Sequence, residues 1–494
     1  MVYPRRAPTQ TRHTNEGEMI MAKSDLHYMG AVEALDLFKK KKLSPVELMD
    51  AVIARAEAVQ PTINSLSQTF FDEARDKSKK AEEKYARGAR TRAIEGLPLA
   101  LKDEEVLKGL PSTSGSLAFK DNIGEYTTFI AERCFNAGGI MHARTTTPEF
   151  SCAGVTHSKL WGVTRNPWNT KFTPGGSSGG TGATLAAGAA TLASGSDIGG
   201  SIRIPASQSG VVGFKPPYGR NPQGHIFNLD FYCHTGPMAR SVADVALLQN
   251  VMSGPHNRDI ATVKPKIRLP LEYESVKGMK IAWSMDLGFY EVDKDVVKNT
   301  KAALKKLQDA GAIVEEVDIG WTPRVMTAAM NYLGHLFGGV IGQVLTRHRH
   351  EMMPYAVQIA EYGARTTAAD FIESLNIAGE MYDTLGPLLT KYDALICPTN
   401  ATAAIPADHD STRDKIVING VEVDPMLGWA MTPPFNIMSR CPVLNVPSGR
   451  DRNGMPTGIQ IVGPTYEDAT VFRIGAAVEA ADPWYTKAAH RPKL

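Results

Sequence analysis

The sequence predicts an α/β fold in one large domain, and three observations lead to this prediction. Short apolar segments alternate with amphipathic helical segments along most of the 494 residues, which is typical of an α/β fold. No stretch has the composition of a long linker, and the chain contains no internal repeat. Residues 321–390 interrupt the alternation and are predicted to form a helical excursion.

The first predicted elements follow from local signals. Ser44 and Glu47 form a capping box and a proline follows Ser44, so a helix begins here. Residues 71–88 are dense in Glu, Lys and Arg, which predicts a helix with a solvated face. The apolar run 96–101 starts at turn residues and predicts a buried strand that stops at Lys102.

The same signals extend the alternation to the C-terminus. Further helices are predicted at 127–136, from the Ser241 cap to 252, at 292–310 and at 467–480. Further strands are predicted at 140–144, 280–283, 312–319, 393–397, 443–446 and 458–462. The order strand, helix, strand from 280 to 319 makes a βαβ unit.

Composition and charge exclude several classes of function. Lys and Arg number 54 against 52 Asp and Glu, and a net charge of +2 is too small for a dedicated nucleic-acid or polybasic membrane binder. Hydrophobic residues make up 43% of the chain, enough for a substantial core. The five cysteines form no CxxC pair, which predicts a reducing, cytoplasmic location and argues against structural zinc.

Two segments need separate interpretation. Residues 1–25 contain three arginines but no apolar core of a secretory signal, so we expect a disordered tail there and a folded domain over 26–494. Residues 172–196 carry no charge, but Gly, Ala, Ser and Thr dominate them. We therefore expect a closely packed buried segment and no membrane span.

Two serines stand in glycine-rich surroundings. Residues 175–180 read Gly-Gly-Ser-Ser-Gly-Gly and include Ser177, and Ser201 follows two further glycines. Glycine permits positive φ angles and close approach, so serines in such turns are typically held exposed at catalytic sites. An oxyanion beside Ser201 requires converging backbone N–H groups. The candidate donors are those of Ile198, Gly199, Gly200 and Ser201.

Other interpretations of these serines have less support. The chain has neither a P-loop GxxxxGK[ST] nor a GxGxxG between a strand and a helix, so a phosphate cradle is not expected. Residues 175–179 match GxSxG formally, but that motif needs a later histidine. The candidates for it are His225, His234, His335 and His409, none in a telling context. No HExxH occurs, so we expect no metal and no other cofactor.

A serine nucleophile without histidine needs another base. A lysine kept neutral by burial is an alternative, and Lys102 is the candidate because α/β folds assemble their sites at strand ends. An ordinary salt bridge is the competing role for such a lysine. No SxxK occurs, which excludes the arrangement of penicillin-binding proteins and β-lactamases.

Together these motifs resemble those of the amidase signature family. The core of that family looks like GGSSGG, then GxDxGGSIRxPA and GxKP, and this chain matches it at 175–180, 195–206 and 213–216. Flanking matches are Gly96-Leu97-Pro98, Thr147-Pro148-Glu149-Phe150, Arg165-Asn166-Pro167-Trp168, Gly236-Pro237-Met238-Ala239-Arg240 and Gly458-Ile459-Gln460. The resemblance spans roughly residues 30–480.

The resemblance implies one α/β/α domain around a large mixed, twisted sheet covered by helices. It also implies a Ser-Ser-Lys triad of Lys102, Ser177 and Ser201. Ser201 would attack the carbonyl, and its proton would pass through Ser177, whose peptide bond to the preceding glycine is cis in the family, to neutral Lys102. The N–H groups of residues 198–201 would hold the oxyanion. No metal or organic cofactor is implied.

Three further residues receive supporting roles from the resemblance. Ser178 is expected to hydrogen-bond within the triad, and Asp197 and Arg203 are expected to support the loop. The chain also departs from the family pattern. Lys-Asp-Glu ending at Glu104 replaces the usual Lys-Asp-Asn, and Arg144-Thr145-Thr146 replaces Lys-Thr-Asn. His157-Ser158 replaces an acidic residue or Asn in a segment expected to line the substrate site.

The implied function is a serine amidohydrolase that cleaves C–N bonds through an acyl-enzyme on Ser201. Its substrate is predicted to be a small-molecule aryl or alkyl amide, with carbamates and esters within reach of the same chemistry. Methionines and aromatics in 321–390 suggest a variable substrate-side region, and buried helix faces are the alternative.

Two rival functions stay open. In the first, the chain is the glutaminase-type subunit of a tRNA-dependent amidotransferase, which needs a partner. In the second, it is a catalytically silent binding protein on the same scaffold. No nucleic-acid or membrane partner is expected, and a homodimer remains open.

Overall fold

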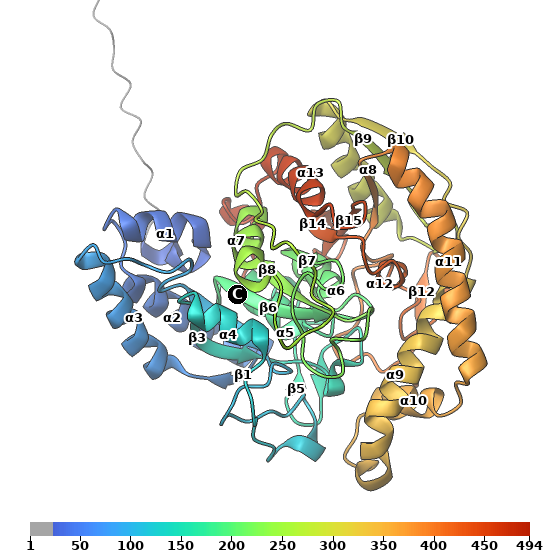
Figure 1. Ribbon diagram of the computed structural model, residues 1–494, viewed down its shortest axis with the longest axis horizontal. Helices are drawn as coiled ribbons and strands as arrows, with labels where there is room; N and C mark the ends of the chain where they lie inside the picture. Colours follow the sequence, from blue (N-terminus) through green and yellow to red (C-terminus); the bar gives the residue numbers. More distant parts are fainter. Residues whose placement is uncertain (1–22) are drawn as a thin grey trace, which may run out of the picture.

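One large sheet runs through the computed structural model, which describes residues 23–494 (Figure 1). The strands are β1 (Leu66–Thr69), β2 (Pro98–Lys102), β3 (Ile140–Thr145), β4 (His157–Ser158), β5 (Gly162–Val163), β6 (Leu192–Asp197), β7 (Val212–Lys215), β8 (His234–Ala239), β9 (Lys280–Trp283), β10 (Ile313–Glu316), β11 (Ala394–Pro398), β12 (Ile416–Ile418), β13 (Val421–Val423), β14 (Val443–Arg450) and β15 (Pro456–Val462). The α-helices are α1 (Ala31–Lys39), α2 (Pro45–Ile63), α3 (Phe71–Ala86), α4 (Phe129–Asn136), α5 (Gly179–Ala186), α6 (Arg203–Ser209), α7 (Val242–Met252), α8 (Lys294–Asp309), α9 (Arg324–His348), α10 (Pro354–Gly363), α11 (Ala368–Lys391), α12 (Pro434–Ile437) and α13 (Asp468–Ala481).

Within residues 23–494 the main sheet has 11 strands in the order β1-β3-β2-β6-β8-β7-β14-β15-β11-β9-β10. β2 is parallel to both β3 and β6, and β9 is parallel to both β10 and β11. The remaining pairs in this sheet are antiparallel. The prediction of an α/β fold with a mixed central sheet is therefore confirmed.

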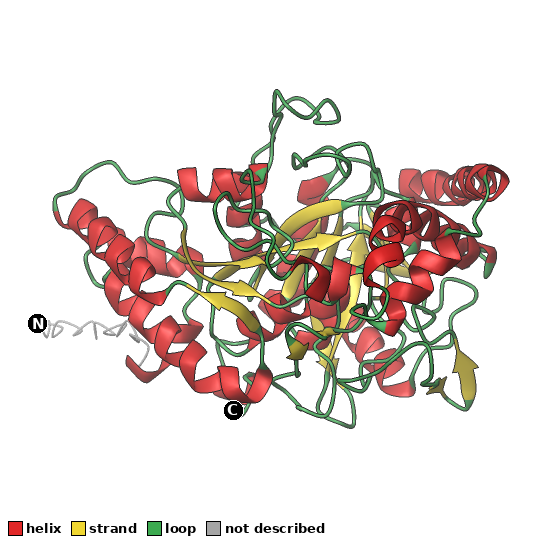
Figure 2. Ribbon diagram, turned by 90° about the horizontal axis from the view of Figure 1, so that it is seen from below, coloured by secondary structure: helices red, strands yellow, loops and turns green. Residues whose placement is uncertain are grey.

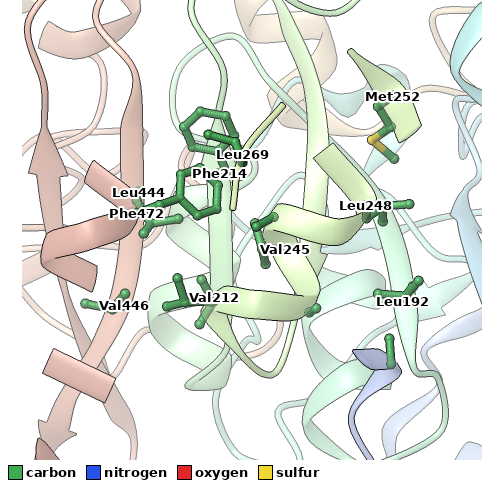
Figure 3. Packing of buried hydrophobic residues seen from close by; sticks show 14 of the residues in the cluster. Leu192, Val212, Phe214, Val245, Leu248, Met252, Leu269, Leu444, Val446 and Phe472 are labelled. Atoms are coloured by element: carbon green, nitrogen blue, oxygen red, sulfur yellow. The ribbon is translucent and has the colours of Figure 1, made fainter. Parts of the chain in front are cut away.

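Helices cover both faces of this sheet (Figure 2). Along β14, Leu444 and Val446 point into the core that also contains residues of α7 and α13, whereas Val443 joins the core beneath α9–α11. Such alternation is expected for a strand buried on both faces. Figure 3 shows the first of these cores, where the rings of Phe214 and Phe472 lie 4.7 Å apart.

The elements predicted from local sequence signals are largely present in the structure. At the start of α2, Ser44 Oγ accepts a hydrogen bond from Val46 N–H at 2.9 Å, and Glu47 Oε2 accepts one from Ser44 N–H at 3.0 Å. The region 321–390 contains the helices α9, α10 and α11, as expected, and Figure 1 shows them at one end of the molecule. β10 is shorter than the predicted strand 312–319 because its pairing with β9 stops where β9 ends.

The uncharged segment 172–196 is buried from residue 173 onward and contains α5 and β6, so its interpretation as a closely packed segment is confirmed. No helix among the described residues is long and apolar enough to cross a membrane.

The predicted disordered tail covered residues 1–25, of which 1–22 lie outside the described residues. The prediction is wrong for 23–25, which belong to the 3-10 helix Lys23–Tyr28. The physical reason is a distant contact, since Asp25 accepts a hydrogen bond from Arg491 near the C-terminus at 3.0 Å.

Candidate active site

The topology of the sheet brings the predicted site residues to one edge. β2 and β6 are parallel neighbours, so their carboxyl ends meet there. Lys102 is the last residue of β2, and Asp197 is the last residue of β6. Ser177 directly precedes the α5 N-cap, and Ser201 lies in the turn between β6 and α6.

Lys102 is fully buried and lies among oxygen atoms. Its Nζ donates hydrogen bonds to Ser177 Oγ at 2.7 Å and to Ser196 Oγ at 2.8 Å, and lies 3.0 Å from Glu104 Oε2. Burial lowers the pKa of the Lys102 ammonium, and the neighbouring Glu104 carboxylate opposes this by raising it. The lysine is therefore placed to exchange a proton with Ser177.

The backbone around Ser177 is shaped by close contacts. The Gly176–Ser177 peptide bond is cis. A Cβ on Gly176 would lie 2.6 Å from the carbonyl oxygens of Ala153 and Val155, so no other residue fits at this position. The next N–H, that of Ser178, donates to the Ser201 carbonyl at 3.1 Å, which ties the two serine loops together. The Ser201 hydroxyl itself makes no hydrogen bond within residues 23–494.

The turn that holds Ser201 is built around the Asp197 carboxylate. Arg203 pairs with it through Nε to Oδ2 and Nη2 to Oδ1, both at 2.9 Å, and Asn436 Nδ2 donates to Oδ1 at 2.8 Å. Burial alone would raise the pKa of Asp197, but Arg203 and Asn436 lower it to about 2. Asp197 and Arg203 thus pair with each other at the turn of Ser201, and their supporting role stays a prediction.

The predicted oxyanion hole needs one correction. The N–H of Gly200 donates to Asp197 Oδ1 at 2.9 Å, so it is engaged and does not point to a free site. The N–H groups of Ile198, Gly199 and Ser201 have no acceptor within the described part of the chain. Three of the four predicted donors are therefore free, because the carboxylate that shapes the turn takes up the fourth.

Gly200 offers a test of this turn. Its φ is +126°, and an added Cβ would lie 2.6 Å from Thr432 Cβ. We expect Gly200→Ala to lower the free energy of unfolding by about 2 kcal/mol and kcat by about 100-fold, because the turn is displaced. Gly199→Ala is the matched control for stability, since its nearest new contact is Leu333 Cδ1 at 3.6 Å. Thermal unfolding measures the stability of the two variants, and steady-state kinetics measures kcat. Equal stability of the two variants would contradict the predicted strain at Gly200.

The role expected for Ser178 also needs correction. Its hydroxyl donates to the Ser196 carbonyl at 3.4 Å and accepts from Ser196 N–H at 3.3 Å, rather than binding a triad side chain. Ser196 in turn accepts the hydrogen bond from Lys102. Ser178 thus supports the triad through the backbone of β6.

Several residues of the site were not found from the sequence. Ser196 stands inside a matched motif without a predicted role, although its hydroxyl contacts Lys102. Thr432 donates to the Gly199 carbonyl at 2.7 Å, and Asn436 binds both Asp197 and the Tyr232 carbonyl. No local signal marks Thr432 or Asn436, whereas Gln460, which accepts from Arg203 at 2.8 Å, belongs to a flanking motif.

A cavity of about 280 Å³ adjoins the triad. Glu104 and Ser196, which both contact Lys102, line it, as does Ile198 from the turn of Ser201. Neither Ser177 nor Ser201 lines it directly. Its aromatic wall consists of Phe119, Tyr126, Phe129, Phe150, Phe227 and Phe337.

Region 321–390, which is predicted to be a substrate-side region, forms only a small part of the wall of this cavity. Within the described residues, it contributes Phe337 and Val340 to the cavity wall. Tyr332, Met352 and Tyr355 are buried in the core instead. The aromatic wall comes mainly from the segments 119–129, 150–151 and 222–235. Helical periodicity shows that a face is apolar, but not whether a neighbour or a ligand covers it.

The histidines that the structure describes make no hydrogen bond to either predicted catalytic serine. His234 lies beside the Asp197 and Ser439 carbonyls, both at 3.2 Å, and burial lowers its pKa to about 3. His225 lines the cavity, but within residues 23–494 no histidine hydrogen-bonds to Ser177 or Ser201. His157 binds the His409 carbonyl at 2.9 Å and does not line the cavity, whereas Phe150 and Ser151 of the same segment do.

The chain is similar to several known proteins over most of its length. The family model described as Amidase matches residues 47–472. The chain is 32% identical to an acylamidase of Rhodococcus erythropolis, over 94% of this chain and 98% of that protein. It is 29% identical to one of the subunits of the glutamyl-tRNA(Gln) amidotransferase of Carboxydothermus hydrogenoformans, over 95% and 100% of the two chains.

The fold is also similar to that of a solved structure. The structure of a bacterial aryl acylamidase of the amidase signature family superposes with a TM-score of 0.87 at 29% identity, covering 95% of this chain and all of the other. The family model spans most of the chain, and the sequence relatives cover nearly all of it. The chain therefore belongs to the amidase signature family of amidohydrolases, as its motifs predicted.

Proposed function

We propose that this chain hydrolyses small aryl or alkyl amides through an acyl-enzyme on Ser201, with Ser177 and Lys102 as the proton relay. The observation that carries the proposal is the 2.7 Å contact from buried Lys102 Nζ to Ser177 Oγ, beside an aromatic cavity. The acylamidase and aryl acylamidase relatives support the substrate class.

The proposed reaction has two balanced halves. Ser201 Oγ bonds to the carbonyl carbon, its proton passes to Ser177 Oγ, and the Ser177 proton passes to neutral Lys102. The free N–H groups of Ile198, Gly199 and Ser201 stabilise the oxyanion. As the C–N bond breaks, Ser177 returns a proton to the leaving amine and regains one from Lys102. Water then attacks the acyl-enzyme by the same relay and releases the carboxylic acid.

The charges of the cavity favour a neutral substrate over glutamine. Its ionisable lining includes Glu104, Glu105 and His225, and within the described residues no lysine or arginine lines it. The α-carboxylate of free glutamine would therefore lie near carboxylates without a cationic partner. This supports an acylamidase over the glutaminase-type role, although amidotransferase subunits also occur among the relatives. Carbamates and esters present a similar carbonyl and belong to the proposal as secondary substrates.

A substrate panel tests this proposal. We expect turnover of acetanilide-type amides and slower turnover of an aryl carbamate. For glutamine we expect kcat/KM to be lower by about 10- to 100-fold, because a buried polar group without a partner costs about 1–3 kcal/mol. The panel is run on the purified chain alone, without tRNA or partner proteins. Ammonia release from glutamine at a rate equal to anilide hydrolysis would overturn the proposed substrate class.

A further inference from the structure

Glu104 is a carboxylate at the inner end of the cavity that the proposed relay does not use. It follows Lys102 by two residues, and its Oε2 lies 3.0 Å from Lys102 Nζ. Its side chain is 24% exposed, whereas that of Lys102 is completely buried, so Glu104 stands between the lysine and the cavity. The amidase signature motif that this chain resembles has an asparagine here, which is one methylene shorter than Glu104 and carries no charge.

The surroundings of Lys102 Nζ indicate what this carboxylate does. An ammonium has three N–H donors, and three acceptors surround Nζ, namely Ser177 Oγ, Ser196 Oγ and Glu104 Oε2. A neutral amine keeps two N–H groups and one lone pair. When Ser196 and Glu104 accept those two N–H groups, the lone pair points at Ser177, which is the orientation that a base requires.

We propose that Glu104 is a positioning residue of the hydrolysis: it directs the Lys102 lone pair toward Ser177, and its negative charge sets the pH at which Lys102 becomes a base. This rests on the proposed function, because it assumes that neutral Lys102 receives the Ser177 proton. Glu104 takes up no proton in the cycle.

The charges that face the pair are consistent with an ionised Glu104. Burial alone would raise its pKa, but Lys102 and the nearby hydroxyls of Ser151 and Ser196 lower it. Burial lowers the pKa of Lys102, and Glu104 is the strongest influence raising it. Glu105 and the Cys233 thiol face Lys102 as well, with weaker effects.

Arg144 fixes the segment that contains Glu104. Its Nη2 donates to the carbonyls of Asp103 and Glu105, at 2.8 and 2.6 Å, and its Nη1 donates to the Pro111 carbonyl. These bonds hold the backbone on both sides of Glu104. A planar guanidinium can bind several carbonyls at once, whereas a lysine there would act as a single point charge. The two departures from the family pattern, at 104 and 144, thus act on one segment.

The test compares Glu104→Gln, Glu104→Ala and the wild type. Gln keeps an acceptor but removes the charge, so the Lys102 pKa falls and the acid limb of kcat/KM moves to lower pH by about one unit or more. At pH values below the acid limb of the wild type, Glu104→Gln is therefore the faster enzyme. Structural damage would not produce such a gain. Glu104→Ala shows the same shift but also loses about tenfold in the plateau kcat, because the lone pair is no longer oriented.

Glu105→Gln is the matched control, since Glu105 lines the same cavity but bonds to Thr128 and not to Lys102. Burial raises the pKa of Glu105 to about 7, so its removal reports the effect of a nearby titrating carboxylate without contact to the lysine. We expect it to shift the acid limb by less than half as much. The pH dependence of fluorophosphonate labelling repeats the measurement without any amide substrate.

The outcomes separate the inference from the proposed function. An acid limb in Glu104→Gln equal to that of the wild type overturns the inference. So does a loss above 1,000-fold at every pH with the fold intact by circular dichroism, because Glu104 would then be a proton acceptor. A wild type that neither reacts with fluorophosphonate nor turns over an anilide contradicts the proposed function instead. Glu104→Asn replaces Glu104→Gln if the latter fails to fold.

Discussion

Ser201→Ala is expected to reduce kcat/KM for an anilide by about 10⁴-fold or more while leaving the fold intact. The loss is large because the proposed mechanism forms the acyl-enzyme on the Ser201 hydroxyl, which alanine lacks. The stability change is expected to be small, since the Ser201 hydroxyl makes no hydrogen bond within residues 23–494. Steady-state kinetics together with thermal unfolding check both expectations.

Ser178→Ala is the matched control for this variant. Ser178 is equally part of the glycine-rich turns, but its hydroxyl binds the Ser196 backbone. We expect a loss of about 1 kcal/mol in unfolding free energy and retention of the acyl-enzyme chemistry. If Ser178→Ala lost as much activity as Ser201→Ala, the assignment of the nucleophile would be contradicted.

Lys102→Met is expected to lower kcat/KM by about 10³–10⁴-fold at neutral pH. Methionine keeps much of the buried stem but offers no lone pair to Ser177, so the relay has no base. Because triad residues act as a unit, the double variant with Ser201→Ala should be no slower than Ser201→Ala alone. Full activity of Lys102→Met at neutral pH would contradict the mechanism.

A stability control accompanies this variant. Removing the lysine leaves Glu104 without its partner at 3.0 Å, and an unpaired, mostly buried carboxylate is destabilising. The double variant Lys102→Met with Glu104→Gln removes that charge. We expect it to unfold at a higher temperature than Lys102→Met and to be equally inactive, which separates lost chemistry from lost stability.

Much of the fold could be predicted because its signals are local. The caps at Ser44 and Ser241 and the alternation of strand and helix depend on neighbouring residues, and these elements formed as expected. The hairpin of β12 and β13 was missed although Asn419-Gly420 between them is a typical turn signal. The order of strands in the sheet depends on distant pairings that no local pattern contains.

In the candidate site, too, some residues could be predicted from the sequence and some contacts could not. Lys102, Ser177 and Ser201 stand in recognisable motifs, and the structure places Lys102 and Ser177 in contact. Their catalytic roles stay predictions. The engagement of the Gly200 N–H was not predictable, because it depends on how the Asp197 carboxylate folds back on its own turn. Thr432 reaches the same turn from far along the chain and carries no motif.

The apolar region 321–390 illustrates a limit of periodicity. Tyr332 lies on the buried face of α9 and donates to Asp230 at 2.7 Å, while Phe337, on the same helix, faces the cavity. Both belong to an apolar stripe, and the sequence gives them the same appearance. Only the packing of the loops against α9 decides which residue meets a ligand.

The most direct test of the central claim is fluorophosphonate labelling of the wild-type chain, followed by digestion and mass mapping of the modified peptide. We expect a single adduct on Ser201, formed together with loss of anilide turnover and absent in Ser201→Ala. An adduct on Ser177 or Ser178, or full anilide turnover in a chain that does not react, would contradict the assignment of Ser201 as the nucleophile.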